Sequence, residues 1–416
     1  MGGDLTATGA SAAYSVTNLV GTTATVTASA GFDATVTATL ATATGTADVM
    51  NINFARSLTL TSADTPDATT DTPVTVRGIK TSSIETVNVS SAGTITNTKN
   101  FVDQNLITNT LTLFTDTTNK TTSIVVTGNK EFVLGGMGVT RDGTSQNVTA
   151  ADFTTNTPSE GIYQNSTLDA ADTATADVQA ALTLIDASGS TGGVGIWAGT
   201  KDALTGSWNQ IYDGLTIKGG SGSDRIRNDA KAGVTTGGDG ADWLVVNGAL
   251  GTADGGAGND TLVAMFGSRA TLTGGTGANT FDVSAAKQGA TTTLRDADAN
   301  VLSTATINAT VITDFKAGDT MKVNASNASS GLMVAGNATV TASGAQSVWA
   351  SIDAALEGST VGTNVTTWFN FGGNTYIVTE TGSGDGFTDI ISVRWQRHQI
   401  APQPNHAPCM YANVRI

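Results

Sequence analysis

A glycine-rich nonapeptide recurs at almost constant spacing in the second half of the chain. It reads GGSGSDRIR from Gly219, GGDGADWLV from Gly237, GGAGNDTLV from Gly255 and GGTGANTFD from Gly274, in steps of 18, 18 and 19 residues. The first three copies match GGxGxDxUx, where U is a large apolar residue, and the fourth has Asn279 in place of the aspartate. A flexible linker would not keep this period, so the glycines belong to an ordered repeat.

Eighteen residues are enough for two units of a six-residue turn and a three-residue strand, which together close one coil of a flattened parallel roll. Successive coils then lie about 4.8 Å apart, as in any sheet. Because the motif recurs every 18 residues and not every nine, its turns stack along one edge. The apolar U residues, Ile226, Leu244, Leu262 and Phe281, are predicted to point inward and form the thin core.

The stacked turns have the composition of calcium sites. Their glycines permit positive φ, and carbonyl oxygens together with one carboxylate per turn supply the hard oxygen ligands that Ca²⁺ takes, whereas Mg²⁺ demands a stricter octahedron. Four turns leave three gaps, which predicts two well-formed calcium sites, a weaker third beside Asn279, and little or no binding at the opposite edge. The predicted metal-site residues are Gly219, Gly220, Gly222, Asp224, Gly237, Gly238, Gly240, Asp242, Gly255, Gly256, Gly258, Asp260, Gly274, Gly275, Gly277 and Asn279.

Two other interpretations of the glycines were weighed. A glycine-rich structural solenoid that binds no metal is the simpler alternative to calcium binding. A phosphate-binding loop is disfavoured, because no copy continues as GxGxxG and the following residues alternate as a strand where a helix is required.

Composition narrows the function. The net charge of -15 disfavours nucleic acid and anionic membranes as partners and favours divalent cations. The only histidines and the only cysteine, His398, His406 and Cys409, lie near the C-terminus, so residues 1–393 cannot form a Ser-His-Asp triad or a His/Cys zinc site. We therefore predict that the protein is not an enzyme, and no catalytic residue is assigned.

No segment has the length and apolar character of a membrane span, and the first residues lack the charged and apolar regions of a Sec-type signal peptide. The chain is expected to be cytosolic, a fragment, or exported by a route that reads another signal.

Residues 1–215 contain short runs of alternating apolar and polar residues, separated by Gly, Asn, Asp, Ser and Thr. This pattern predicts strands, in a parallel β-solenoid or, alternatively, in tandem β-sandwiches. We expect four segments: this one, the calcium-binding β-roll at 216–285, a capping or secretion-related region at 286–393, and 394–416. The last is read as a disordered tail foreign to the fold, with a natural disordered terminus as the alternative.

The region 286–393 contains signals for a cap. Trp368 to Phe371 and Thr375 to Val378 flank a GGN turn, which predicts a β-hairpin, and the apolar spacing between Gln346 and Leu356 predicts a short helix. Helix and hairpin would protect the exposed edge of the last coil. The expected fold is therefore an all-β parallel solenoid or roll with calcium-binding turns, capped by a short helix and a hairpin.

The tandem GGxGxDxUx copies resemble the calcium-binding repeats of RTX proteins. The stretch ATVITDFKAGDTMKV, with Asp314, Phe315, Gly318 and Asp319, is similar to the segment that closes such rolls, and the Thr/Ala/Val-rich strands look like the C-terminal part of RTX-type bacterial surface-layer proteins. The resemblance implies export by type I secretion, which reads an uncleaved C-terminal signal. It also implies a location outside the cell.

Three functions follow. The leading hypothesis is a surface-layer (S-layer) subunit that folds in Ca²⁺ and assembles with copies of itself into a two-dimensional lattice, held on cell-surface polysaccharide through a region upstream of residue 1. The second is a calcium-dependent secreted adhesin, and the third is a β-helical polysaccharide-modifying enzyme. An enzyme would need a groove with clustered Asp, Arg and aromatic residues. The nearby aromatic group is Trp197, Trp208 and Tyr212, and we interpret it as core or loop packing.

The sequence leaves open whether residues 1–215 bind further calcium through scattered acids such as Asp186.

Overall fold

The protein is all-β wherever its structure is described. The computed structural model describes residues 3–7, 14–19, 23–28, 33–40, 47–60, 74–97, 108–111, 113–116, 120–134, 161–164, 181–198, 200–201, 208–209, 214–247, 250–265, 269–283, 292–293, 310–322, 366–371, 374–380 and 386–395. None of these residues is helical. The chain divides into two compact units, Met1–Leu244 and Val245–Ile416, which are described separately.

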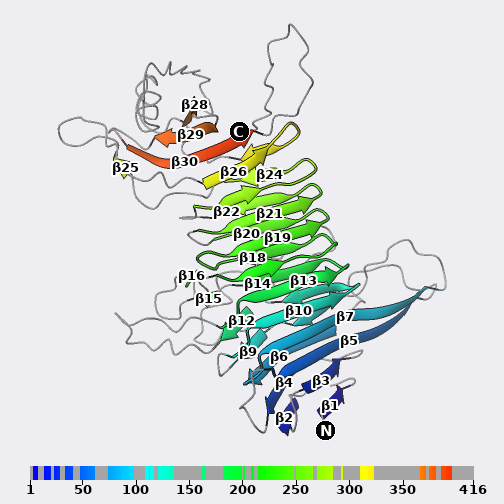
Figure 1. Ribbon diagram of the computed structural model, residues 1–416. Coiled ribbons are helices and arrows are strands. Elements are labelled where there is room, and N and C mark those ends of the chain that lie inside the picture. Colours follow the sequence, from blue (N-terminus) through cyan, green and yellow to red (C-terminus); the bar gives the residue numbers. More distant parts are fainter. Residues whose placement is uncertain are drawn as a thin grey trace. The chain divides into compact units, whose positions relative to one another are not determined.

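The first unit contains two long sheets of mostly parallel strands, sheet A and sheet B, and the chain runs back and forth between them (Figure 1). Sheet A contains, in spatial order, β1 (Gly3–Ala7), β3 (Thr23–Ala28), β5 (Val49–Leu60), β7 (Thr86–Asn97), β10 (Ser123–Gly128), β13 (Leu184–Ser190), β17 (Thr216–Lys218) and β19 (Val234–Asp239). Sheet B contains β12 (Gly161–Gln164), β9 (Leu113–Asp116), β6 (Val74–Ser82), β8 (Thr108–Leu111), β11 (Glu131–Leu134), β14 (Val194–Ala198) and β18 (Arg225–Asn228). Strand β4 (Asp33–Leu40) also pairs with β6, and β2 (Tyr14–Leu19) pairs with β4.

The second unit continues the same pattern of strands. One of its sheets contains β21 (Thr252–Ala257), β23 (Thr271–Thr273), β26 (Thr310–Phe315), β30 (Gly386–Trp395), β29 (Asn374–Glu380) and β28 (Thr366–Phe371), with β25 (Thr292–Thr293) beside β30. The other contains β22 (Thr261–Ala264), β24 (Thr280–Asp282) and β27 (Thr320–Lys322). The boundary between the units falls inside β20 (Trp243–Val246), and β15 (Thr200–Lys201) and β16 (Trp208–Asn209) form a separate antiparallel pair in the first unit.

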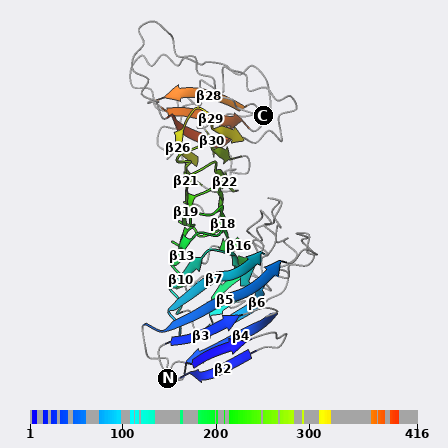
Figure 2. The same ribbon diagram turned by 90° about the vertical axis from the view of Figure 1, so that its right-hand side faces the viewer.

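In the parallel sheet, apolar residues of successive strands lie directly above one another. The core therefore consists of columns of apolar side chains. Met50 pairs with Val87, Val87 with Ile124, Ile124 with Ile185, and Ile185 with Ile217. All five side chains are fully buried. Figure 2 shows the two sheets of this unit from the side, with β13 and β19 on one side and β18 on the other.

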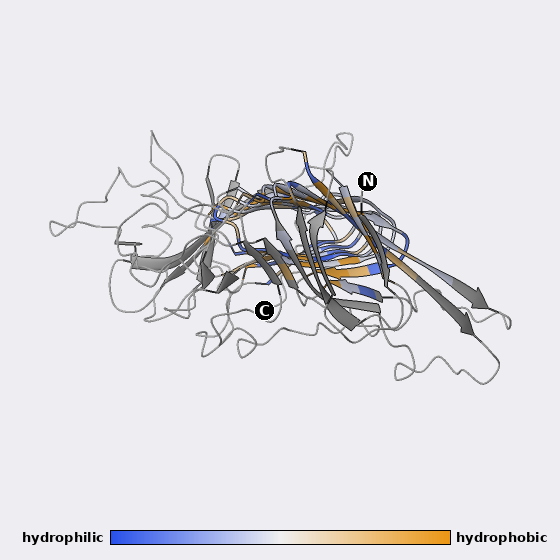
Figure 3. Cartoon of the chain, turned by 90° about the horizontal axis from the view of Figure 1, so that it is seen from below, coloured by the Kyte–Doolittle hydropathy of each residue, from blue (hydrophilic) through white to orange (hydrophobic). Residues whose placement is uncertain are grey.

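The predicted inward residues of the repeat lie in the core. Ile226, Leu244, Leu262 and Phe281 are each 0% exposed, which confirms that prediction. Strands β18 and β22, which contain Ile226 and Leu262, alternate buried and half-buried residues, whereas β20, which contains Leu244, has three successive buried residues. Figure 3 shows orange, apolar stretches and blue, hydrophilic stretches along the described strands. The thin core is therefore built from one face of each sheet.

Long parallel sheets that alternate along the chain are consistent with a parallel β-solenoid. Tandem β-sandwiches, the alternative for residues 1–215, would be built of antiparallel sheets, whereas β1, β3, β5, β7, β10 and β13 pair in parallel. The division at Leu244 falls inside the segment 216–285 that the sequence treats as one roll.

The closing region contains the predicted hairpin. Strands β28 and β29 pair antiparallel, with Phe371 opposite Asn374, and β30 pairs with both β29 and β26. The predicted helix between Gln346 and Leu356 lies outside the described residues. Strand β30 includes Arg394 and Trp395, so the sheet extends two residues into the stretch expected to be foreign to the fold. Residues 396–416 lie outside the described part of the chain.

Candidate functional site: the stacked turns

Five turns connect a strand of one sheet to a strand of the other, two of them in the first unit and three in the second. We number them turn 1 (219–224), turn 2 (237–242), turn 3 (255–260), turn 4 (274–279) and turn 5 (314–319). Turns 1 and 2 belong to the first unit and turns 3 to 5 to the second. The sequence motif predicts the first four, and the DFKAGD stretch forms the fifth.

In the first unit, the aspartate at the sixth position of each turn forms hydrogen bonds with the neighbouring turn or strand. The backbone N–H of Asp224 donates a 2.7 Å hydrogen bond to Oδ1 of Asp242, and the N–H of Val194 donates at 2.8 Å to Oδ1 of Asp224. The N–H of Gly220 donates at 2.7 Å to Oδ2 of Asp224. Each carboxylate is thus fixed by the backbone of the turn or strand before it.

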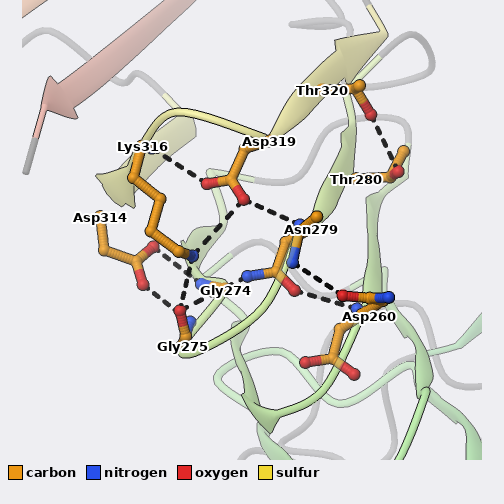
Figure 4. A network of polar contacts seen from close by, with 11 residues as sticks. Asp260, Gly274, Gly275, Asn279, Thr280, Asp314, Lys316, Asp319 and Thr320 are labelled. Atoms are coloured by element: carbon orange, nitrogen blue, oxygen red, sulfur yellow. Dashed lines mark hydrogen bonds and ion pairs between the residues drawn. The ribbon is translucent and has the colours of Figure 1, made fainter.

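The second unit repeats this relationship. The N–H of Asp260 donates to Oδ1 of Asn279 at 2.9 Å, and the N–H of Asn279 donates to Oδ1 of Asp319 at 2.8 Å (Figure 4). Asn279, the departure from the motif, therefore occupies the same place as the aspartates. Turn 5 occupies the next place in the stack, although it lacks the GGxGxD pattern.

In each unit these residues form a row, and all of them are withdrawn from solvent. Asp224, Asp242, Asp260, Asn279 and Asp319 are 0%, 2%, 1%, 1% and 4% exposed. Burial of a carboxylate is unfavourable unless hydrogen bonds or a cation compensate. A row of buried carboxylates is hence an arrangement that a cation would stabilise.

The glycines are required by space and by backbone conformation. A methyl group on Gly219 would overlap both Oδ2 of Asp224 and the carbonyl oxygen of Gly237, and one on Gly255 would overlap Oδ2 of Asp260. In turns 2, 3 and 4 the second and third glycines have positive φ, as at Gly238 with 113°. In turn 1 no glycine has positive φ, so there the expectation of left-handed glycines is wrong. Turn 1 follows an irregular SGSTGG segment instead of another motif copy.

The oxygen atoms of the turns fit a hard cation. At Gly219, a side-chain oxygen of turn 1 and a carbonyl oxygen of turn 2 converge on the space that a side chain would fill. Oδ2 of Asp242 and Oδ2 of Asp260 are buried and accept no hydrogen bond within the described residues, although both residues are hydrogen-bonded through other atoms. The described residues contain no cluster of three or more His, Cys, Asp or Glu side chains. Calcium at this edge would therefore depend on carbonyl oxygens as well as carboxylates.

Burial changes the acidity of Asp224. It raises the pKa of this carboxyl to about 7, although the N–H groups of Val194 and Gly220 act in the opposite direction. A nearby cation favours the ionised form. Asp224 is therefore a group whose charge a bound cation would control.

The structure groups the predicted site residues by unit. It brings Gly219, Gly220, Gly222 and Asp224 together with Gly237, Gly238, Gly240 and Asp242 in the first unit. In the second unit it brings Gly255, Gly256, Gly258 and Asp260 together with Gly274, Gly275, Gly277 and Asn279. The sequence-based site omitted Asp314, Lys316 and Asp319, which complete the stack in turn 5. The carboxylate at the sixth position of the DFKAGD stretch, Asp319, is the signal in the sequence that points to this turn.

The opposite edge next to turn 1 is occupied by side-chain hydrogen bonds. Asn228 donates to the carbonyl oxygen of Leu215 at 3.0 Å, and Arg227 contacts Asp229 at 2.8 Å. Trp197 is 4% exposed and donates from Nε1 to Asp229 at 3.0 Å. Trp197 is therefore a packing residue, as expected; Trp208 lies in β16, and Tyr212 lies outside the described residues.

Asp186 already has partners. Burial opposes its ionisation, but hydrogen bonds from Ser188 and the positive charge of Lys218 hold the pKa of Asp186 below its ordinary value. The Lys218 ammonium lies 3.3 Å from its carboxylate. This acid is thus neutralised by the chain itself.

No protein-family model matches the chain, and no curated protein matches it. None of the described segments is a helix long and apolar enough to cross a membrane.

Proposed function

We propose that the stacked turns bind calcium and that calcium binding stabilises the roll. The observation that carries this proposal is the row of buried carboxylates in register, in which Asp224 and Asp242 are linked through a backbone N–H. In the absence of a cation these buried charges oppose folding, and the glycines add a large loss of backbone entropy. When calcium binds only the folded state, its binding free energy adds to the stability of the fold.

We expect this calcium-linked folding to operate when the protein is secreted. Calcium is scarce inside cells and about 1 mM outside, a concentration that fills extracellular-type sites with dissociation constants of about 10⁻⁴ to 10⁻³ M. Where calcium is scarce, the roll would be less stable, which favours an unfolded chain during export by a type I secretion apparatus and folding outside. The net charge of -15 would favour the uptake of cations there.

Within this class, a surface-layer subunit is the function we favour. It is supported by the resemblance of the repeats and of the Thr-rich strands to RTX-type surface-layer proteins, and by long parallel sheets that suit a structural role. The hairpin β28–β29 and strand β30, which pairs with β26, would cap the last coil. The protein would then assemble with copies of itself on the cell surface.

Two measurements test the proposal. Circular dichroism of the purified chain should show a gain of β signal when calcium is added to chelator-treated protein, and no gain would exclude calcium-linked folding. Electron micrographs of the calcium-bound protein should show ordered sheets or a symmetric oligomer. Monomers that bind a cell-surface ligand would favour the adhesin over the lattice.

A further inference from the structure

Turn 5 contains a cation that belongs to the chain itself. The ammonium nitrogen of Lys316 donates a 2.7 Å hydrogen bond to the carbonyl oxygen of Gly275 in turn 4, and it lies 3.4 Å from Oδ1 of Asp319 (Figure 4). The Lys316 side chain is 24% exposed and that of Asp319 is 0% exposed. The positive charge is therefore directed into the gap between turns 4 and 5.

In earlier turns the equivalent carbonyl group has a different partner. The carbonyl oxygen of Gly220 accepts from the N–H of Asp239 at 3.0 Å, and that of Gly256 accepts from the N–H of Thr276 at 2.8 Å. At Gly275 the register would offer the backbone N–H of Lys316, but that N–H donates to Oδ2 of Asp319 at 3.0 Å. The side chain of Lys316 donates to this carbonyl oxygen instead, at 2.7 Å, beside a longer 3.5 Å contact from Nδ2 of Asn279, and it adds a charge.

The charges of the gap also differ from those of the other turns. Turns 1 and 2 place two carboxylates in the row, whereas turn 4 contributes the neutral Asn279 and turn 5 contributes Asp319. The second carboxylate of turn 5, Asp314, accepts hydrogen bonds from the N–H groups of Gly274 and Gly275 at 2.8 and 2.7 Å. Within turn 5, one ammonium thus lies beside the one row carboxylate of that turn.

We propose that Lys316 is a built-in cation that closes the gap between turns 4 and 5 without calcium. It neutralises Asp319 and engages the carbonyl group of turn 4, the two kinds of group that calcium would contact in the other gaps. When the ammonium is removed, this gap becomes dependent on calcium. Only this last consequence rests on the proposed calcium binding.

Hydrogen exchange of the full chain, followed by mass spectrometry or NMR, tests the inference. The variant is Lys316→Met, and the matched control is Lys322→Met, because Lys322 is a nearby lysine that is 59% exposed and lies 3.6 Å from Asp282. In chelator, the amide of Asn279 is expected to exchange about 10- to 100-fold faster in Lys316→Met than in the wild type or the control, since Asp319 loses its cation. Addition of calcium should restore its protection.

Further variants keep the test decisive. Lys316→Arg retains the charge and should retain protection in chelator, whereas Lys316→Gln, a milder change for use if the Met variant does not fold, should lose it. Equal exchange in chelator for Lys316→Met and Lys322→Met would overturn the proposal. Loss of protection that calcium fails to restore, in a protein whose turn 2 responds to calcium, would overturn the equivalence with calcium. If no turn of the wild type responds to calcium, the proposed function fails, while the comparison in chelator still decides the role of Lys316.

Discussion

The backbone N–H of Asp224 donates a 2.7 Å hydrogen bond to Oδ1 of Asp242, which lies eighteen residues later in the chain. The same contact joins Asp260 to Asn279 at 2.9 Å. An amide oxygen therefore replaces a carboxylate oxygen in this contact. A mutation can therefore remove the negative charge of a row residue while it keeps the hydrogen bond.

The variant Asp242→Asn should separate them. It keeps the acceptor for Asp224 and removes a buried charge, so we expect calcium affinity to fall by roughly tenfold or more while the Tm in chelator stays equal or rises. Titration calorimetry and thermal melts measure the two effects. Asp239→Asn, an exposed change in turn 2, is the control and should alter neither. Destabilisation in chelator with unchanged calcium affinity would mean that Asp242 has a purely structural role.

The reverse change, Asn279→Asp, should complete the motif of turn 4. A second carboxylate next to Asp260 is expected to strengthen the predicted weak site, so the variant should gain Tm in calcium and lose Tm in chelator relative to the wild type. Melts in both conditions check this prediction. A shift in the same direction in both would show that the effect does not depend on calcium.

Replacement of Gly238 should disrupt turn 2 directly. Its φ is 113°, and a Cβ atom would overlap the carbonyl oxygen of Gly220, so Gly238→Ala is expected to cost about 2 kcal/mol or more. Gly214→Ala is the matched control, because no atom lies within 4 Å of its Cβ position. Chemical denaturation in calcium measures both, and equal stabilities would contradict the described turn geometry.

The stability of the calcium-free protein should fall as pH rises. Burial raises the pKa of Asp224 to about 7, whereas an unfolded aspartate titrates near 3.9. Between about pH 4 and pH 7 the folded state holds more protons than the unfolded state, so it loses stability across this window, by about 4 kcal/mol at most. Melts in chelator should therefore give a higher Tm at about pH 5 than at about pH 8.

The variant Asp224→Asn is the control for this pH dependence, and it should flatten the profile. Calcium competes with the proton for the carboxylate, so calcium should bind more tightly as pH rises across the same window. A Tm in chelator that increases with pH and is unaffected by Asp224→Asn would assign the dependence to other groups.

The repeat was predictable from the sequence. Its strict period and its apolar residue at a fixed position are compatible with few ways of arranging strands and turns. The same reasoning found no regular repeat in residues 1–215, although Val49, Thr86 and Ser123 share one register at steps of 37 residues. The hydrogen bond from Asn88 to Asn51 follows the same step. The number of residues between the described strands varies along the chain and hides this period, because only the strand residues must match.

Turn 5 shows a second limit of sequence reasoning. Asp319 and Asn279 are forty residues apart, and no spacing in the sequence indicates that they lie in one row. Lys316 is equally inconspicuous, since a lysine in a polar turn usually points to solvent. Its role depends on the register of β26 against β23, which is set by packing of the core columns.

The most direct test is a count of bound calcium by equilibrium dialysis of the wild-type chain and of a variant in which Asp224, Asp242 and Asp260 are all changed to Asn. The wild type should retain about two tightly bound ions and a weaker third, and the variant should lose all of them while its strands remain folded. Equal numbers of bound ions in the two proteins, or none in the wild type, would contradict calcium binding by the stacked turns.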